Sequence, residues 1–173
     1  MSRSFSRRAA RALVSTTLCA ALGAALCQCS PQPAPAPPEA AKAPDFGYDV
    51  ALTFTPAARE KIGKSGDKVS LEALYYGNPT TQTAALADAN DGTIHLDTDT
   101  LETDASDHSV HMDGKGVTSS KNFPYIVEHK PLVLLTVHAT HDGKRTQLIG
   151  CGGFQDYVSV AQTRPIPIRC DLL

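Results

Sequence analysis

The chain has 173 residues, of which 42% are hydrophobic and 20% charged, and its formal net charge is −2. The charges are unevenly divided, because residues 1–44 hold five of the 16 basic residues but only one of the 18 acidic residues. Residues 45–173 therefore carry 11 basic and 17 acidic side chains, a net charge of −6, which disfavours nucleic acid and anionic lipid as partners. Those 129 residues are enough for one domain with a sizeable core.

Residues 1–29 are predicted to be an export signal. A basic start contains Arg3, Arg7, Arg8 and Arg11. It precedes an alanine-rich apolar run from Ala12 to Cys27, which is too short for a membrane-spanning helix. Residues 30–44 are rich in proline and alanine and cannot pack into a core, so they are predicted to form a semi-rigid tether.

This N-terminal layout resembles that of a bacterial lipoprotein precursor, over roughly the first quarter of the chain. The resemblance implies cleavage before a cysteine that is then acylated, so that only the lipid contacts the membrane. Cys29 is the best candidate for lipid attachment, with Leu26 three residues before it. Cys27 and Gln28 depart from the small residues usual in this class. The alternative is ordinary cleavage after Ala25, which would release a soluble periplasmic or secreted protein.

The first part of the folded region alternates apolar and polar residues. Residues 48–55 and 69–76 have period two and predict strands. Between them, Thr55-Pro56 predicts a capped helix that ends near Ile62, before Gly63. Gly77-Asn78-Pro79 ends the second strand, and residues 80–89 are predicted to form a loop.

A turn at Asn90-Asp91-Gly92 predicts a third strand over residues 93–101. Simple alternation places Ile94 and Leu96 on one face of it, and His95, Asp97 and Asp99 on the other. A fourth strand is predicted around Val110 and Met112, and one helical turn over residues 123–129.

Pro131 to His141 is apolar on both faces and predicts a central strand. Asp142-Gly143 predicts a hairpin that returns the chain to Cys151. Helical spacing predicts a short helix whose apolar stripe contains Phe154, Tyr157, Val158 and Ala161. Residues 166–172 predict a last strand, placed at a sheet edge by Pro165 and Pro167.

About seven short strands with two or three short helices predict a mainly β domain, a two-sheet antiparallel sandwich of immunoglobulin-like or transthyretin-like architecture. The chain has no tryptophan, so it lacks the Cys…Trp…Cys signature of a true immunoglobulin domain. Cys151 and Cys170 are the two cysteines of the folded part, and in an exported domain they are expected to form a disulfide.

Two chemical hypotheses compete with a purely structural interpretation. A free Cys151 thiolate at a helix start would be a nucleophile with His138 or His141 as its base, but a disulfide removes that thiol. The spacing of His108 and His111, as of His138 and His141, suggests a metal site. Residues three apart on a strand point to opposite faces, so neither pair can chelate a metal alone, and a site would need one histidine from each of two strands. Surface histidines are expected instead, with no metal and no cofactor.

Residues 88–113 hold eight acidic residues and no lysine or arginine. A calcium loop is disfavoured, because Gly92 comes one residue too early for the EF-hand pattern. The run therefore predicts either a solvated strand face or a patch that docks a basic partner. The candidate binding surface comprises Tyr76, Asp97, Asp99, Asp104 and Asp107.

The function expected from these features is that of a non-catalytic lipoprotein on the periplasmic side of the bacterial envelope, which binds an envelope protein or a peptidoglycan component. One alternative is an inhibitor or immunity-type protein against a basic wall-degrading enzyme. Another is a periplasmic metal-binding protein or small enzyme that uses histidine residues. The sequence predicts no oligomeric state.

Overall fold

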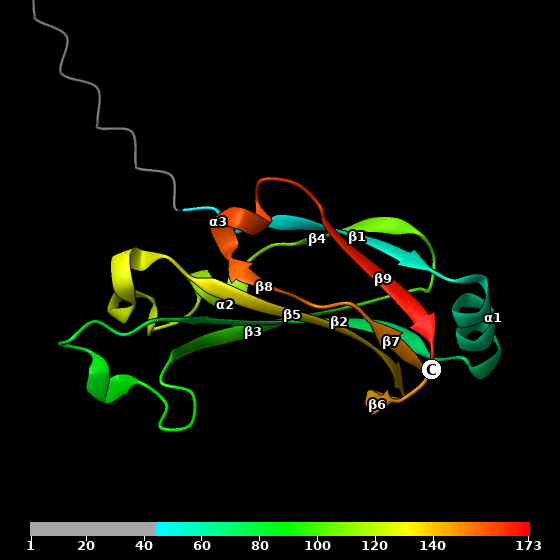
Figure 1. Cartoon of the computed structure of the whole chain (residues 1–173), viewed down its shortest axis with the longest axis horizontal. Helices are drawn as coiled ribbons and strands as arrows, with labels where there is room; N and C mark the ends of the chain where they lie inside the picture. The colour runs from blue at the N-terminus through cyan, green and yellow to red at the C-terminus, as the bar shows by residue number, and fades with distance from the viewer. Residues whose placement is uncertain (1–43) are drawn as a thin grey trace, which may run out of the picture. The chain divides into compact units, whose positions relative to one another are not determined.

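A computed structural model describes residues 44–173, which form a mainly β domain of two sheets with three short α-helices (Figure 1). The predicted two-sheet sandwich is confirmed. The export signal, the acylated cysteine predicted at position 29 and the tether up to residue 43 lie outside the described residues.

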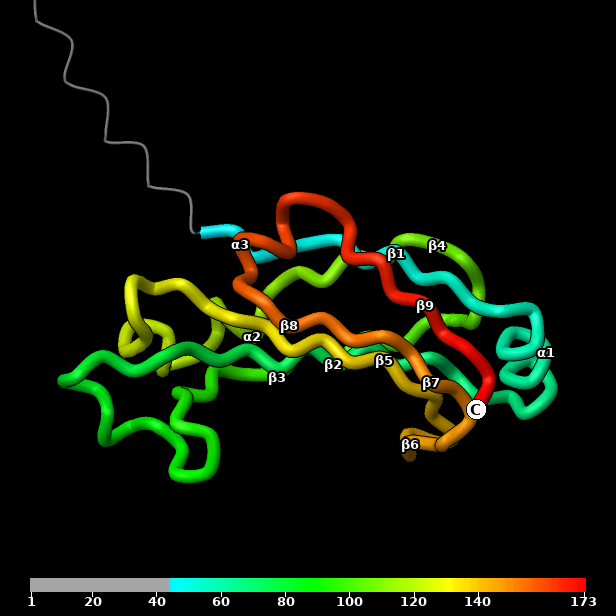
Figure 2. Tube along the Cα trace, in the orientation of Figure 1, coloured from blue at the N-terminus to red at the C-terminus, as the bar shows by residue number. Residues whose placement is uncertain are grey.

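Each sheet combines strands from distant parts of the chain (Figure 2). The four-stranded sheet has the order β4 (His108–Met112), β1 (Tyr48–Phe54), β9 (Ile166–Leu172) and β7 (Ile149–Cys151). The five-stranded sheet has the order β3 (Ile94–Thr103), β2 (Lys68–Gly77), β5 (Leu132–His141) and β6 (Lys144–Thr146), and β8 (Phe154–Tyr157) also pairs with β5. Among the described strands, all pairs are antiparallel except β1 and β9.

The core lies between the sheets and follows the predicted alternation. Every second residue of β1, from Tyr48 to Phe54, is buried, and so is every second residue of β2 from Val69 to Tyr75. Strand β5 is central, as predicted, since it pairs with β2 on one side and with β6 and β8 on the other. The turn at Asp142 and Gly143 between β5 and β6 is also confirmed, with φ of 49° and 72°.

Helix α1 (Pro56–Ser65) starts where the sequence predicts. Thr55 Oγ1 accepts a hydrogen bond of 3.4 Å from the Ala58 N–H, and Pro56 opens the helix. The helix runs past the predicted end near Ile62, because the left-handed stop falls at Gly66, with φ of 74°.

The last strand is at a sheet edge over only part of its length. β9 lies between β1 and β7, but β7 pairs with it from Cys170 onward. Pro167, in register with Ala51, precedes that pairing. The Arg169 carbonyl accepts a hydrogen bond from the Gly152 N–H, on the β7 side of β9. The nitrogen of Pro167, two residues earlier, points to that same side, where β9 is not yet paired. The N–H that proline lacks is therefore not needed for a strand pairing.

Three local predictions are corrected by the structure. Residues 154–157 form β8 rather than the first turn of a helix, because they pair with residues 132–135 of β5, and α3 spans only Val158–Ala161. Residues 123–129 form two 3₁₀ turns, Phe123–Tyr125 and Val127–His129, and another occupies Ala84–Leu86 in the predicted loop. Helix α2 (Lys115–Thr118) was not predicted.

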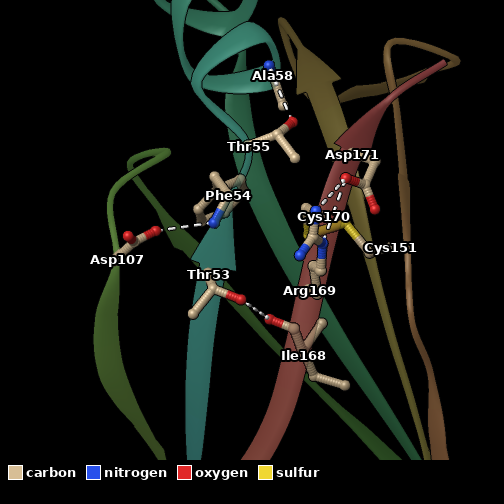
Figure 3. Close-up of a disulfide and its surroundings, with 10 residues drawn as sticks. All are labelled: Thr53, Phe54, Thr55, Ala58, Asp107, Cys151, Ile168, Arg169, Cys170 and Asp171. Atoms are coloured by element: carbon tan, nitrogen blue, oxygen red, sulfur yellow. Dashed lines mark hydrogen bonds and ion pairs between the residues drawn. A yellow bond between two sulfur atoms is a disulfide. The ribbon is translucent and has the colours of Figure 1, made fainter.

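The predicted disulfide is confirmed. Cys151 of β7 stands directly opposite Cys170 of β9, with the two Cα atoms 4.1 Å apart (Figure 3). The bridge attaches β7 to the four-stranded sheet just after the chain has left β6 in the five-stranded sheet. It also leaves no free thiol at Cys151 for the nucleophile hypothesis.

Candidate binding site

The outer face of the five-stranded sheet carries two cross-strand rows of side chains over β3, β2, β5 and β8. The first row contains His95, Tyr76, Leu132 and Tyr157, and the second contains Thr98, Leu74, Leu134 and Gln155. We call these eight residues the Tyr76–Tyr157 face. Solvated faces of antiparallel sheets are usually polar, so three leucines and two tyrosines on one such face require an explanation.

This face follows from a strand that is apolar on both sides. The odd-numbered residues of β5, such as Val133 and Leu135, are buried in the core, which turns Leu132 and Leu134 outward to half-buried positions. The helices lie at the ends and the edge of the sandwich, and among the described residues none packs over this outer face (Figure 1).

A pocket of about 150 Å³ opens at the Tyr157 end of the first row. We call it the Tyr157 pocket; its lining residues are Asn78, Val127, Glu128, Lys130 and Tyr157. The Val127 N–H donates to the Asn78 carbonyl at 2.9 Å, which joins the segments that follow β2 and precede β5. Tyr157 belongs to both the face and the pocket, and the residue is 38% exposed.

The wall of the Tyr157 pocket has a strained backbone. Glu128 and His129 are consecutive non-glycine residues with φ of 54° and 51°. Each such conformation costs about 1–3 kcal/mol, and persists only where the surroundings enforce it. The neighbouring Ile126 is buried and fills the space where a Cβ on Gly77 would stand, which holds this segment against the end of β2.

Few charges occur within the site, and those present are paired. The Tyr76 hydroxyl accepts a 2.6 Å hydrogen bond from Gln155 Nε2. His95, at the edge of the face, lies 2.7 Å from Asp91, and hydrogen bonds from His95 and Thr93 lower the pKa of Asp91 to about 2.

In the pocket, Lys130 forms an ion pair with Glu128. Their hydrogen bond raises the pKa of Lys130 and lowers that of Glu128, so both groups stay charged at neutral pH.

The structure does not bring the five residues of the predicted binding surface together. Tyr76 lies on the outer face, and Asp97 is exposed on β3, where it accepts a hydrogen bond of 3.3 Å from Ser119. A β-bulge in β3, opposite Leu74 to Tyr76, shifts the alternation after Asp97.

Asp99 therefore points inward rather than sharing the face of His95. Its carboxylate accepts from the Tyr75 hydroxyl at 3.1 Å and from the Gly116 N–H at 2.8 Å. Burial raises the pKa of Tyr75, and it raises that of the neighbouring Tyr48 to about 12, so both phenols remain protonated donors.

Asp104 and Asp107 lie at the opposite end of the sandwich, beside α1, about 20 Å from Asp97 at the usual rise of a strand. Asp104 pairs with Lys68 at 2.8 Å. Asp107 accepts from the Phe54 N–H at 2.8 Å (Figure 3) and from Arg59 at 3.3 Å. Both aspartates thus have local partners.

The histidines are dispersed over both sheets. His108 lies 2.8 Å from Thr103 Oγ1, and the partners of His111 and His141, both at 2.8 Å, are Asp49 and Asp67. His138 is buried on the outer face beyond the two rows, and burial lowers its pKa. Within residues 44–173, no cluster of three or more His, Cys, Asp or Glu residues is placed to hold a metal ion.

Sequence reasoning found Tyr76 but missed the pocket. The sequence pattern predicts Tyr157 in the apolar stripe of a short helix and Asn78 in a turn. The doubly apolar stretch from Pro131 to His141 did contain a signal, since half of its side chains had to face away from the core.

No helix in residues 44–173 combines the length and apolar character needed to span a membrane. Comparison with protein-family models, with curated proteins and with solved structures finds no match to this chain.

Proposed function

We propose that this protein is a non-catalytic binding protein of the bacterial cell envelope. It is exported by residues 1–29, anchored through lipid on Cys29 and faces the periplasm. There it binds an envelope component through the Tyr76–Tyr157 face and the Tyr157 pocket. The observation that carries this proposal is the meeting, at Tyr157, of a pocket, a strained wall and an uncovered apolar sheet face.

The disulfide and the charge of the domain support this location. A structural disulfide persists in oxidising compartments such as the periplasm. The net charge of −6 over residues 45–173 disfavours contact between the domain and anionic lipid, so the membrane is contacted only through the N-terminal lipid.

The site suits recognition because several of its side chains already have partners: Gln155 bonds Tyr76, and Lys130 pairs with Glu128. Tyrosine offers a large amphipathic ring with few rotatable bonds, and Gln155 restrains the ring of Tyr76 through its hydroxyl. The leucines between the rings supply apolar contact area, while Asn78, Glu128 and Lys130 provide directed polar groups. Little ordering entropy is then lost on binding.

The binding site is tested with the full chain and its Tyr157→Ala variant. Wild-type protein is expected to co-sediment with isolated cell-wall sacculi or to capture a component of solubilised envelope, and Tyr157→Ala to lose this. Asp97→Asn and Asp104→Asn are matched surface controls that should bind normally. Undiminished binding by Tyr157→Ala, with loss in the aspartate variants, would overturn the proposal in favour of the acidic run.

The anchor is tested separately by metabolic labelling with a fatty acid. Label is expected in the wild-type chain and absent from Cys29→Ala, while Cys19→Ala keeps it. Label in Cys29→Ala, or a soluble unlabelled wild-type protein, would remove the anchored form and leave the binding site untouched.

A further inference from the structure

We infer that the ligand of the Tyr76–Tyr157 face is an oligosaccharide of N-acetylated amino sugars, laid flat across β2, β5 and β8. The inference rests on the proposed function and names the ligand class of that same site.

The first cross-strand row has the length of a short sugar chain. Tyr76 on β2 and Tyr157 on β8 stand in one row with Leu132 of β5 between them. Neighbouring strands are about 4.8 Å apart, so the Cα atoms of the two tyrosines are roughly 10 Å apart and the whole row is roughly 14 Å long at the backbone. A flat surface of this size accommodates a chain of linked rings, each with an apolar C–H face that stacks on an aromatic or leucine side chain.

The Tyr76–Tyr157 face carries almost no charge. Of its eight residues only His95, at the edge, is of a type that can carry a charge near neutral pH. Farther along the same outer face, the next rows carry charged residues: Glu72, Glu102, Lys68 and Arg145. The uncharged area is therefore local, and its polar groups are the hydroxyl and amide of Thr98 and Gln155 and the phenols. These groups match sugar hydroxyls, whereas a charged peptide finds no counterion among the two rows.

The Tyr157 pocket, at the end of the first row, has a lining that suits an acetamido group. Its volume of about 150 Å³ is sufficient for a ring substituent such as an acetamido group. Val127 offers an apolar wall for a methyl group, and Asn78 offers an amide for a carbonyl or N–H. Glu128 and Lys130 neutralise each other, so the pocket selects no net charge. An acetamido group, with one methyl and one amide, fits this lining.

The test uses isothermal titration calorimetry on the full chain with three probes. These are chitotetraose, cellotetraose, which lacks acetamido groups, and the zwitterionic tetrapeptide Ala-Glu-Lys-Ala. Chitotetraose is expected to bind tightest. Tyr157→Ala should weaken it by about tenfold or more, as for a buried aromatic contact. Asn78→Ala should reduce the preference for chitotetraose over cellotetraose. Tyr125→Ala, an exposed tyrosine outside the face and the pocket, should bind as wild type.

The outcomes separate this inference from the proposed function. If sacculi or an envelope protein are bound in a Tyr157-dependent way but chitotetraose is not bound at millimolar concentration, the saccharide assignment is overturned and the binding function stands. Binding of the tetrapeptide in place of both sugars also overturns it. Equal affinity of Tyr157→Ala and wild type for chitotetraose would remove the saccharide from this face. Unchanged melting temperatures exclude misfolding as the cause of any loss.

Discussion

Gln155 of β8 and Tyr76 of β2 are hydrogen-bonded at 2.6 Å across the outer face of β5, the strand that lies between them. The bond ties together two strands that do not pair with each other, and it holds the amide and phenol ends of the Tyr76–Tyr157 face in one arrangement. A side chain with no cross-strand partner would have to be ordered by the ligand instead.

Gln155→Ala should therefore weaken ligand binding more than it weakens the fold. The group is exposed, so we expect a loss of about 0.5–1 kcal/mol in unfolding free energy, measured by urea denaturation. Retention on sacculi should fall more than this small loss explains. Ser159→Ala changes an exposed residue of α3, four positions after Gln155, and serves as the control. Equal binding by Gln155→Ala and wild type would contradict the idea that Gln155 holds Tyr76 in place for the ligand.

Removing the disulfide should destabilise the domain strongly. The bridge joins residues 19 apart, so the double variant Cys151→Ala, Cys170→Ala should lose about 3 kcal/mol of unfolding free energy in the chain-entropy account. Urea denaturation with and without reductant measures this. Reductant should affect wild type and leave the double variant unchanged. A loss below about 1 kcal/mol would mean that packing alone holds β7 in place.

Asp99 should matter for stability far more than its neighbour Asp97. Asp99→Ala leaves the buried Tyr75 hydroxyl without its carboxylate acceptor and removes the partner of the Gly116 N–H. We expect a loss of about 1–3 kcal/mol by urea denaturation, whereas the exposed Asp97→Ala should stay within about 0.5 kcal/mol. Equal effects of the two changes would contradict the inward orientation of Asp99.

Gly77 should tolerate no side chain while Ile126 is present. A Cβ at position 77 would lie 2.5 Å from Ile126 Cγ2, so Gly77→Ala must push Ile126 and the strained segment after it away. Overpacking of this kind costs about 1–3 kcal/mol, and we expect it to abolish binding at the Tyr157 pocket as well. Melting temperature and ligand binding report the two effects. The double variant with Ile126→Ala should recover part of the stability; no recovery would contradict the clash.

His138 should make the domain less stable in mild acid. Burial lowers the pKa of His138, the positive charge of Arg145 lowers it further, and Glu72 partly opposes both. Because the folded-state pKa lies below the unfolded value near 6.5, the unfolded state binds the proton more readily, so the unfolding free energy falls as the pH drops through 6.5. Urea denaturation between pH 7.5 and pH 5 should therefore show declining stability, and His138→Gln should flatten the decline. If His138→Gln shows the same decline in stability between pH 7.5 and pH 5 as wild type, His138 is not its cause.

Elements with local signals can be predicted from the sequence alone. Period-two alternation predicts the buried faces of β1 and β2, a capping threonine followed by proline predicts the start of α1, and Asp142-Gly143 predicts the β5–β6 turn. Two cysteines in the folded part leave one possible bridge. These features depend on residues a few positions apart, so backbone sterics and periodicity are enough to predict them.

The location of the site, in contrast, depends on how distant segments pair in the folded domain. Asn78, Glu128 and Tyr157 come from three distant segments, and they meet because β2 and β8 both flank β5. A bulge in β3 reverses the orientation of Asp99, and pairing with β5 turns residues 154–157 into a strand. Strand partners and bulges depend on hydrogen bonds between residues far apart in the sequence. The sequence shows that apolar and polar residues alternate, but not the register in which the strand pairs. One extra residue in a bulge therefore reverses which side chains face the core.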